Sequence, residues 1–223
     1  MDRKLFVQAI GKVLCGIVIL GLLIFLPAGT LAFWQGWLLM GVLFIPMIIA
    51  GIVMMIKCPD LLRKRLNARE EQKEQRTVLV LSGLIFLASF VLAGLNFRFV
   101  WMPLPNVVPF VATAVFLIAY MLYAEVLREN TYLSRTVEVQ ENQKVIDTGL
   151  YGIVRHPMYM ATLFLFLAMP LILGSLLSFA IMLFYLPIIQ IRMINEEKVL
   201  SKGLPGYADY MEKVRWRVIP HIW

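Results

Sequence analysis

The sequence predicts an all-α integral membrane protein, and three observations lead to this prediction. Of the 223 residues, 61% are hydrophobic and only 16% are charged, and the mean hydropathy is +0.80, well above the range of an ordinary soluble domain. Several runs with few or no charges reach about 20 residues, the length that a helix needs to span a hydrocarbon core of roughly 30 Å. Because lipid offers no partners for open backbone, these runs should be helices.

Four transmembrane helices are expected in the first part of the chain: residues 5–26, 34–56, 78–97 and 107–127. Basic residues precede the first run as in a signal peptide, but its length and the later apolar runs favour an anchor, interrupted only by Lys12. The apolar stretch 158–194 is too long for one crossing and is broken at Gly174 and Ser175. This predicts a tight helical hairpin and about six transmembrane helices in total.

The distribution of Lys and Arg residues predicts the orientation in the membrane. The segment 57–76 carries seven of them, whereas 27–35 carries none and 98–106 carries one. The positive-inside rule then places 57–76, the segment 128–155 and both termini in the cytosol. The net charge of +7 is better explained by the anionic lipids of the bilayer than by nucleic acid, because the basic residues flank helix ends.

The chain is interpreted as one domain, 1–223, in which 1–106 supplies N-terminal transmembrane helices and 107–223 forms a catalytic region. Ionisable residues are rare in the early helices and collect in three later clusters, which should meet at the cytosolic ends of the last helices. The clusters are Glu125, Arg128, Glu129, Asn130 and Tyr132; residues 149–159, with the sequence GLYGIVRHPMY; and Gln190, Arg192, Asn195, Glu196 and Glu197.

Each cluster also has a purely structural interpretation. Charges at helix ends are usually solvated or reach the headgroups. The spacing of Arg192 and Glu196 suits an i,i+4 ion pair at the surface, and 57–76 is typical of a solvated, amphipathic helix. The middle cluster favours a ligand site, because Pro157 suits the first turn of a helix and puts Arg155 and His156 at an N-terminus that attracts anions.

Other parts of the middle cluster point the same way. Tyr151 and Tyr159 offer aromatic faces to a cation, and Gly149 and Gly152 would let the backbone approach a ligand closely. The sequence lacks the pattern of a metal site, because the two histidines have no cysteine nearby. It also lacks a nucleophile elbow and a dinucleotide-binding glycine fingerprint.

The C-terminal region resembles the isoprenylcysteine carboxyl methyltransferase family of integral membrane enzymes. The matching residues are Gly149-Leu150-Tyr151, then Val154 to Tyr159 with the sequence VRHPMY, then Arg192 and Glu196-Glu197, and finally the tail Gly206-Tyr207-x-x-Tyr210 with Val218-Ile219-Pro220. Order and spacing agree over about the last 85 residues of the chain. The earlier helices match only as generic membrane spans.

This resemblance implies an S-adenosylmethionine site at the cytosolic ends of the last helices, closed by the C-terminal tail. Arg192 would hold the carboxylate of the acceptor. The implied cofactor contacts are Gln140, Gln143, Lys144, Val145, Ile146, Tyr151, His156, Pro157, Met158, Tyr159 and Glu196. Glu197, one residue further along the helix, should be turned away from the face that Arg192 and Glu196 share.

The expected function is methyl transfer from S-adenosylmethionine to a lipophilic acceptor, foremost a prenylcysteine-like carboxylate. A carboxylate is already ionised and needs no general base, whereas a thiol or an ammonium group needs one, and the sequence offers no dedicated candidate. Phospholipid amines, small thiols and a nicotinamide-dependent membrane reductase remain as alternatives. A transporter is disfavoured, because the early helices have almost no polar residues to line a path.

Overall fold

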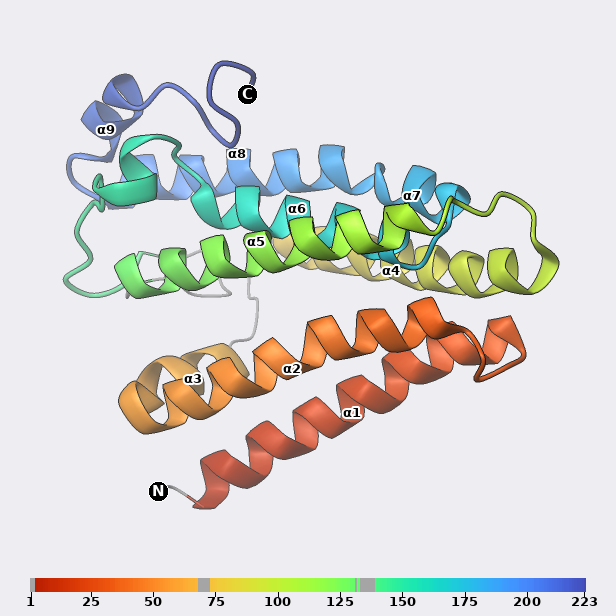
Figure 1. The fold of residues 1–223 in the computed structure, drawn as a ribbon. Coiled ribbons are helices and arrows are strands. Elements are labelled where there is room, and N and C mark those ends of the chain that lie inside the picture. Colours follow the sequence, from red (N-terminus) through yellow and green to blue (C-terminus); the bar gives the residue numbers. More distant parts are fainter. Residues whose placement is uncertain (1–2, 68–72, 131, 133–138) are drawn as a thin grey trace.

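The structure is a computed structural model that describes residues 3–67, 73–130, 132 and 139–223. These residues are mostly helical and form no strand, apart from one isolated β-bridge between Pro103 and Ser175. The helices, shown in Figure 1, are α1 (Arg3–Ala28), α2 (Trp34–Lys57), α3 (Pro59–Asn67), α4 (Lys73–Phe99), α5 (Val107–Glu129), the 3₁₀ turn η1 (Gly149–Gly152), α6 (Pro157–Ile172), α7 (Leu176–Met182), α8 (Tyr185–Gly203) and α9 (Tyr207–Lys213). The expected all-α fold is confirmed.

Five helical segments in the described part of the chain are long and apolar enough to cross a membrane: Lys4–Ala28, Trp34–Lys57, Thr77–Phe99, Val107–Glu129 and Leu176–Gly203. The last of these segments comprises α7 and α8. The five segments support an integral membrane protein. Helix α6 is apolar but has only 16 residues, which at about 1.5 Å per residue is shorter than a hydrocarbon core of roughly 30 Å. The described residues therefore contain five helices of crossing length rather than the expected six, because α6 begins only at Pro157 and ends before Gly174.

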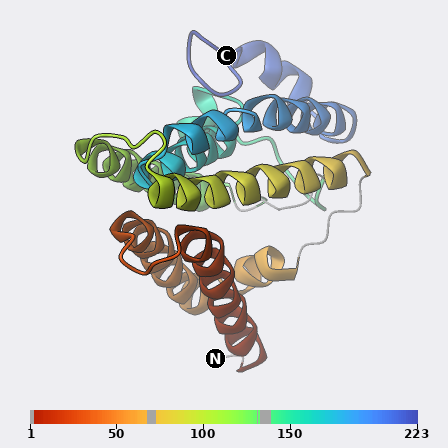
Figure 2. The same ribbon diagram turned by 90° about the vertical axis from the view of Figure 1, so that its right-hand side faces the viewer.

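Helices α1 and α2 lie side by side and pack against α4, α5 and α6 (Figures 1 and 2). The side chains that fill this contact include Ile24 of α1, Leu39 of α2, Phe116 of α5 and Ile172 of α6, all of them fully buried. Lipid tails are as apolar as these side chains, so the hydrophobic effect does not favour contact between helices in a bilayer. The side chains stabilise the fold through close packing instead.

The chain reverses direction between α6 and α7. Gly174 has a φ of +69°, a left-handed conformation that glycine adopts without steric cost. The Ser175 hydroxyl then caps α7 by accepting from the Ser178 N–H at 3.2 Å. The turn is attached to the α4–α5 loop, because the Leu104 N–H donates to the Gly174 carbonyl at 3.0 Å.

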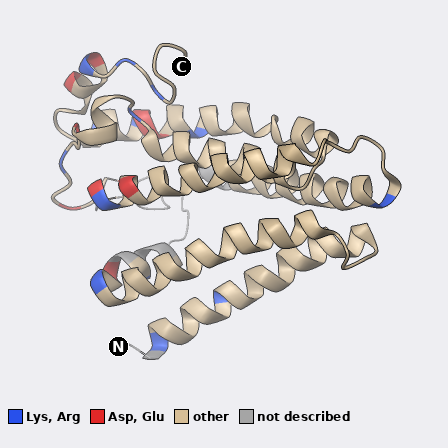
Figure 3. Ribbon diagram, viewed as in Figure 1, with Lys and Arg blue, Asp and Glu red and all other residues tan. Residues whose placement is uncertain are grey.

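This reversal brings three helix ends together. Helices α5 and α8 both end where α6 begins, and we call this the site end of the bundle (Figure 1). Charged residues gather there and are sparse along the middle of the helices (Figure 3). The polar clusters that the sequence analysis singled out therefore lie on converging elements. Residues 68–72 of the basic segment lie outside the described residues.

Candidate active site

The start of α6 is joined to the C-terminal segment of the chain by its backbone. His156 precedes the helix, and Pro157 occupies its first turn, where no N–H is needed. The Arg155 N–H donates to the Trp216 carbonyl at 2.9 Å, and the His156 N–H donates to the Arg217 carbonyl at 2.8 Å. The C-terminal segment after α9 is therefore part of the structure around the site.

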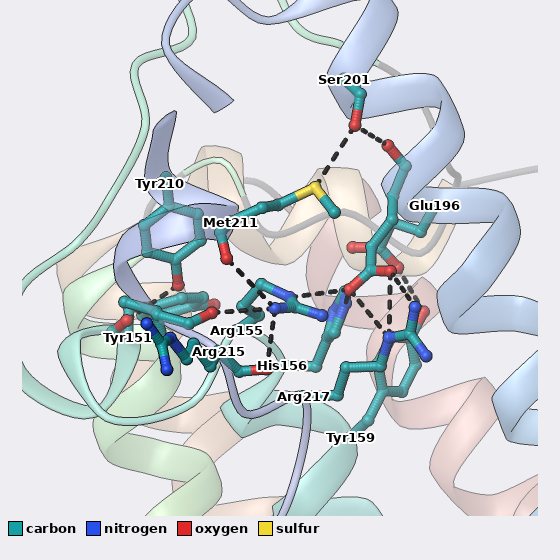
Figure 4. A network of polar contacts seen from close by, with 12 residues as sticks. Tyr151, Arg155, His156, Tyr159, Glu196, Ser201, Tyr210, Met211, Arg215 and Arg217 are labelled. Carbon is teal, nitrogen blue, oxygen red and sulfur yellow. Dashed lines mark hydrogen bonds and ion pairs between the residues drawn. The ribbon is translucent and has the colours of Figure 1, made fainter. Parts of the chain in front are cut away.

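Glu197 lies at the centre of a buried ionic cluster beside this contact. Figure 4 shows its partners Arg155, His156 and Arg217. The Glu197 Oε1 accepts from the Arg155 Nε at 2.9 Å, its Oε2 accepts from an Arg217 terminal nitrogen at 2.9 Å, and the His156 Nε2 lies 3.2 Å from Oε1. The side chain of Glu197 is only 6% exposed. Surrounding a buried carboxylate with such partners offsets the cost of removing its charge from water.

Arg155 lines a cavity at the site end and also makes several structural contacts. Besides Glu197, its guanidinium donates to the Val214 carbonyl at 2.8 Å and to the Arg215 carbonyl at 2.9 Å. Arg155 therefore joins Glu197 and the C-terminal segment to the wall of this cavity, and its binding of a ligand anion stays a prediction. The sequence places Arg155 next to a helix N-terminus, but its partners come from 42 to 60 residues further along the chain, which no local pattern specifies.

A second group of polar side chains joins α6 to α8. The Tyr159 hydroxyl donates to the Glu196 Oε2 at 2.5 Å and accepts from the Arg192 Nε at 3.0 Å. Tyr159 is 4% exposed. Arg192 and Glu196 therefore do not form a plain surface ion pair, because the buried phenol lies between them.

A cavity opens beside these residues at the site end. It is lined from the loop before η1, from η1, from the start of α6, from α8 and from α9. Its lining residues are Asn130, Tyr132, Gln143, Lys144, Val145, Ile146, Tyr151, Arg155, His156, Met158, Tyr159, Arg192, Glu196, Leu200, Leu204, Tyr207 and Tyr210. The structure thus brings all of the sequence-predicted site residues together around one cavity, except Gln140 and Pro157.

Gln140 and Pro157 have other positions. Gln140 turns back on its own loop, where its amide Nε2 donates to the Tyr132 carbonyl at 2.5 Å and its N–H donates to the Gln143 Oε1 at 2.8 Å. Pro157 is buried at the start of α6. The structure therefore gives Gln140 a role in shaping the loop and Pro157 a role in starting the helix.

Several lining residues were not assigned to the site from the sequence. Four of them belong to patterns that the sequence analysis described. Tyr207 and Tyr210 are part of the C-terminal tail motif, and Asn130 and Tyr132 are part of the first polar cluster. Leu200 and Leu204 gave no such signal, since an apolar residue on a helix is usually a packing residue. Only the fold shows that the end of α8 turns these two side chains to the cavity.

The tyrosines around the cavity are fixed by hydrogen bonds and by burial. The Tyr210 hydroxyl donates to the Tyr151 carbonyl at 2.8 Å, and the Asn130 Nδ2 donates to the Tyr151 hydroxyl oxygen at 2.9 Å. Burial raises the pKa of Tyr151, Tyr207 and Tyr210 above that of a free phenol. These side chains therefore stay neutral at physiological pH and offer aromatic faces that attract a cation.

Gly149 is required by packing within the protein. Its φ is +52°, and a Cβ atom at this position would lie 2.3 Å from the Glu129 Oε2. The Glu129 carboxylate accepts from the Thr148 hydroxyl at 2.8 Å and lies directly on the Gly149 backbone. The group that approaches Gly149 closely is therefore the Glu129 carboxylate and not a ligand. This contact holds η1 and Tyr151 against the end of α5.

The arrangement suits a ligand with both charged and apolar parts. Glu196 supplies an acceptor for a cation, Lys144 supplies a positive charge, the tyrosines supply neutral aromatic faces, and Val145, Ile146, Leu200 and Leu204 supply apolar surface. Among the described residues that line the cavity, none is a cysteine or a serine.

Comparison with known proteins agrees with this interpretation. Residues 106–205 match the phospholipid methyltransferase family, a segment that runs from the start of α5 to just after α8 and stops before Tyr207. This family belongs to the integral-membrane methyltransferase superfamily that includes the isoprenylcysteine carboxyl methyltransferases, but the match does not single out the latter. No curated protein matches the chain. The match confirms the expected enzyme class, a methyltransferase, and is consistent with use of S-adenosylmethionine.

Proposed function

We propose that this methyltransferase moves a methyl group from S-adenosylmethionine to a lipophilic acceptor at the cytosolic face of a membrane. The observation that carries the proposal is the cavity at the site end, because the side chains expected to hold the cofactor converge there from four separate segments. The family match covers most of the same segments. A bilayer-embedded fold with its cavity at the helix ends suits an acceptor that reaches the site from the lipid.

The lining residues fit the chemical groups of S-adenosylmethionine. Its ammonium group or its ribose hydroxyls suit the Glu196 carboxylate, and its carboxylate suits Arg155, His156 and Lys144. Its sulfonium suits the neutral tyrosine faces, and its adenine suits the apolar residues of the loop and of α8. When bound, this cofactor supplies an electrophilic methyl group, so the protein has to align the acceptor and keep water out.

The first experiment measures the cofactor itself. Calorimetry on the detergent-solubilised protein should detect binding of S-adenosylmethionine, and labelled methyl groups should enter lipid extracts incubated with it. Titration with nicotinamide cofactors tests the reductase alternative. Absence of S-adenosylmethionine binding, with or without binding of a nicotinamide cofactor, would contradict the proposed function.

The first candidate acceptor is a prenylcysteine-like carboxylate held by Arg192. The Nε contact with Tyr159 fixes the guanidinium plane, and a planar fork suits a carboxylate. Arg192→Lys should then lower kcat/KM by at least about tenfold while cofactor affinity stays nearly unchanged. The matched control is Arg128→Lys, since Arg128 pairs with Glu125 at the surface of α5 outside the cavity. Activity within about twofold of wild type would exclude this role of Arg192.

A phospholipid amine is the second candidate acceptor, and it fits the match to the phospholipid methyltransferase family equally well. Such an acceptor lies in the bilayer with its headgroup at the depth of the helix ends, which is where the cavity opens. It has no carboxylate on its reacting group for the Arg192 fork, so Arg192→Lys should affect its methylation little. The Arg192→Lys comparison therefore separates the two candidates.

A further inference from the structure

We propose that Tyr159 and Glu196 form the proton-accepting pair of this enzyme, serving an acceptor whose nucleophilic nitrogen arrives protonated. The proposal rests on the proposed methyltransferase function and assigns a role beyond ligand binding to two side chains of the cavity. It also supplies the general base that the sequence alone did not reveal. An ammonium group cannot attack a methyl group until it has lost a proton, whereas a carboxylate needs no such step.

The hydrogen-bond geometry around Tyr159 is that of a proton relay. A phenol has one O–H donor and two acceptor positions. The donor of Tyr159 points to the Glu196 Oε2 at 2.5 Å, and one acceptor position receives the Arg192 Nε–H at 3.0 Å. The second lone pair of the same oxygen can accept an N–H from a ligand. Tyr159, Arg192 and Glu196 all line the cavity.

The short distance to Glu196 is central to the inference. Hydrogen bonds from a hydroxyl to a carboxylate are among the strong ones, with usual lengths of roughly 2.5–2.7 Å. A proton that arrives at the Tyr159 oxygen can therefore leave through the existing bond to Glu196 without any movement of the side chains. Glu196 itself lies on α8 at the site end, and it is partly exposed.

The charged groups that face Tyr159 support loss of a proton from an ammonium group. Arg192 and Glu196 face it from α8, the His156 ring lies with its centroid 5.5 Å from that of Tyr159, and Lys144 lines the same cavity. A neighbouring positive charge, which Arg192→Lys would keep, disfavours a second one and so favours the neutral amine. The Glu196 carboxylate then receives the proton and neutralises its own charge.

The proposed step balances in atoms and charge. The ammonium proton passes to the Tyr159 oxygen while the Tyr159 hydroxyl proton passes to the Glu196 Oε2. The freed electron pair of the nitrogen forms the new nitrogen–carbon bond, and the carbon–sulfur bond of the methyl donor breaks with its electron pair remaining on sulfur. An ammonium, a sulfonium and a carboxylate thus become a methylated ammonium, a thioether and a carboxylic acid, and Glu196 afterwards releases its proton to water.

A base is needed because only a small fraction of an alkylamine is neutral near physiological pH. An alkylammonium group with a pKa near the value of about 10.4 found for lysine is neutral in roughly one molecule in 1,000 at pH 7.5 and in about one in ten at pH 9.5. A base in the site removes this limitation. Without the base, the rate should follow the neutral fraction of the acceptor in solution.

The kinetic test uses Tyr159→Phe, which removes the hydroxyl and keeps the ring. With saturating cofactor and a short-chain phospholipid that carries a primary amine headgroup, kcat at pH 7.5 should fall by roughly 100-fold or more. The rate of the variant should then rise about 100-fold between pH 7.5 and pH 9.5, following the neutral amine. His156, Lys144 and Glu196 are present in both proteins, so the ratio of variant to wild type removes the pH effects that the two proteins share. A deficit that stays constant over this range would overturn the proposal.

A binding measurement provides a readout that does not depend on turnover. Wild-type protein without cofactor should bind the amine phospholipid more tightly than the trimethylammonium phospholipid of the same chain length, which has no N–H to donate. Tyr159→Phe should reduce this preference by roughly 2- to 12-fold, the range expected for one hydrogen bond. An unchanged preference would contradict the contact between the Tyr159 oxygen and the ammonium group.

The matched control is Tyr120→Phe, which removes a hydroxyl from a tyrosine of α5 outside the cavity that donates to the Leu43 carbonyl at 2.9 Å. It should leave both the pH profile and the lipid preference of the wild type unchanged. Failure of the proposed function looks different, because wild-type protein would then bind no S-adenosylmethionine. Wild-type protein that binds the cofactor but methylates only carboxylates would retain the proposed function and overturn the proton-accepting pair.

Discussion

Two adjacent glutamates have different surroundings in this structure. Glu196 points to Tyr159 and lines the cavity, whereas Glu197 is buried among Arg155, His156 and Arg217. Successive residues of an α-helix are rotated by about 100° around its axis, so neighbouring side chains face different parts of the molecule. The expectation that Glu197 is turned away from the face of Arg192 agrees with these contacts, but Glu197 is a central structural residue rather than a solvated one.

Glu197→Gln should therefore act mainly on stability. The neutral amide leaves the Arg155 guanidinium, which is 8% exposed, with no charged partner in this cluster, and removing one member of a buried ion pair costs several kcal/mol. We expect a loss of about 3 kcal/mol in the free energy of unfolding, measured by denaturant titration in detergent micelles.

Glu196→Gln is the matched control for this prediction, because it makes the same chemical change one residue away. It should cost less than about 1 kcal/mol, the usual size of a change at a partly exposed position, and should instead weaken cofactor binding. Equal stability of the Glu197→Gln variant and the wild type would mean that the buried cluster is not needed to hold the C-terminal segment.

At the scale of elements, α4 and α7 are joined by a buried pair of serines. The Ser89 and Ser178 hydroxyl oxygens lie 2.7 Å apart, and the Ser178 hydroxyl also lies 2.7 Å from the Ser89 carbonyl. Both residues have no exposed surface. Hydrogen bonds between membrane helices contribute modestly, because the unfolded segments in lipid also find polar partners.

A double-mutant cycle with Ser89→Ala and Ser178→Ala should give a coupling free energy of about 0.6 kcal/mol and at most about 1.7 kcal/mol. The measurement is unfolding in detergent of the wild type, both single variants and the double variant. Ser82→Ala is the control, since the Ser82 hydroxyl bonds to the Val78 carbonyl of its own helix. Additive effects of the two substitutions would contradict the contact between α4 and α7.

At the scale of the whole molecule, the distribution of Lys and Arg predicts the orientation of the protein in the membrane. The loops at the site end, together with the basic segment that follows α2, should face the cytosol. Both native cysteines, Cys15 and Cys58, are exposed, and Cys58 directly follows α2. Cys58 is therefore a natural probe of the side on which the site end lies.

A Cys15→Ser variant, which keeps only Cys58, should resist labelling by a membrane-impermeant maleimide in intact cells and should react in inverted vesicles. The matched control carries Trp101→Cys in a chain without native cysteines, since Trp101 is exposed in the loop that follows α4 at the opposite end. This control should react in intact cells. Labelling of Cys58 from outside would reverse the orientation and move the cavity to the other face of the membrane.

The sequence by itself was sufficient to predict the all-α membrane fold and the position of most helices, because hydropathy along the chain is a local property that directly reflects the thickness of the bilayer. It also indicated the polar clusters that line the cavity, since ionisable residues are costly within apolar segments and therefore mark a site. The length of α6 was less evident, because Pro157 and Gly174 limit an apolar stretch that hydropathy alone would extend.

Only the tertiary structure decided which polar side chains pair with one another. Arg155 and Glu197 are 42 residues apart in the chain, and Tyr159 and Glu196 are 37 apart. Such pairs depend on the rotation of α8 about its axis and on the path of the C-terminal segment, which no local pattern specifies. For this reason the pairing of Arg155 with Glu197 and the bond between Tyr159 and Glu196 became apparent only in the fold.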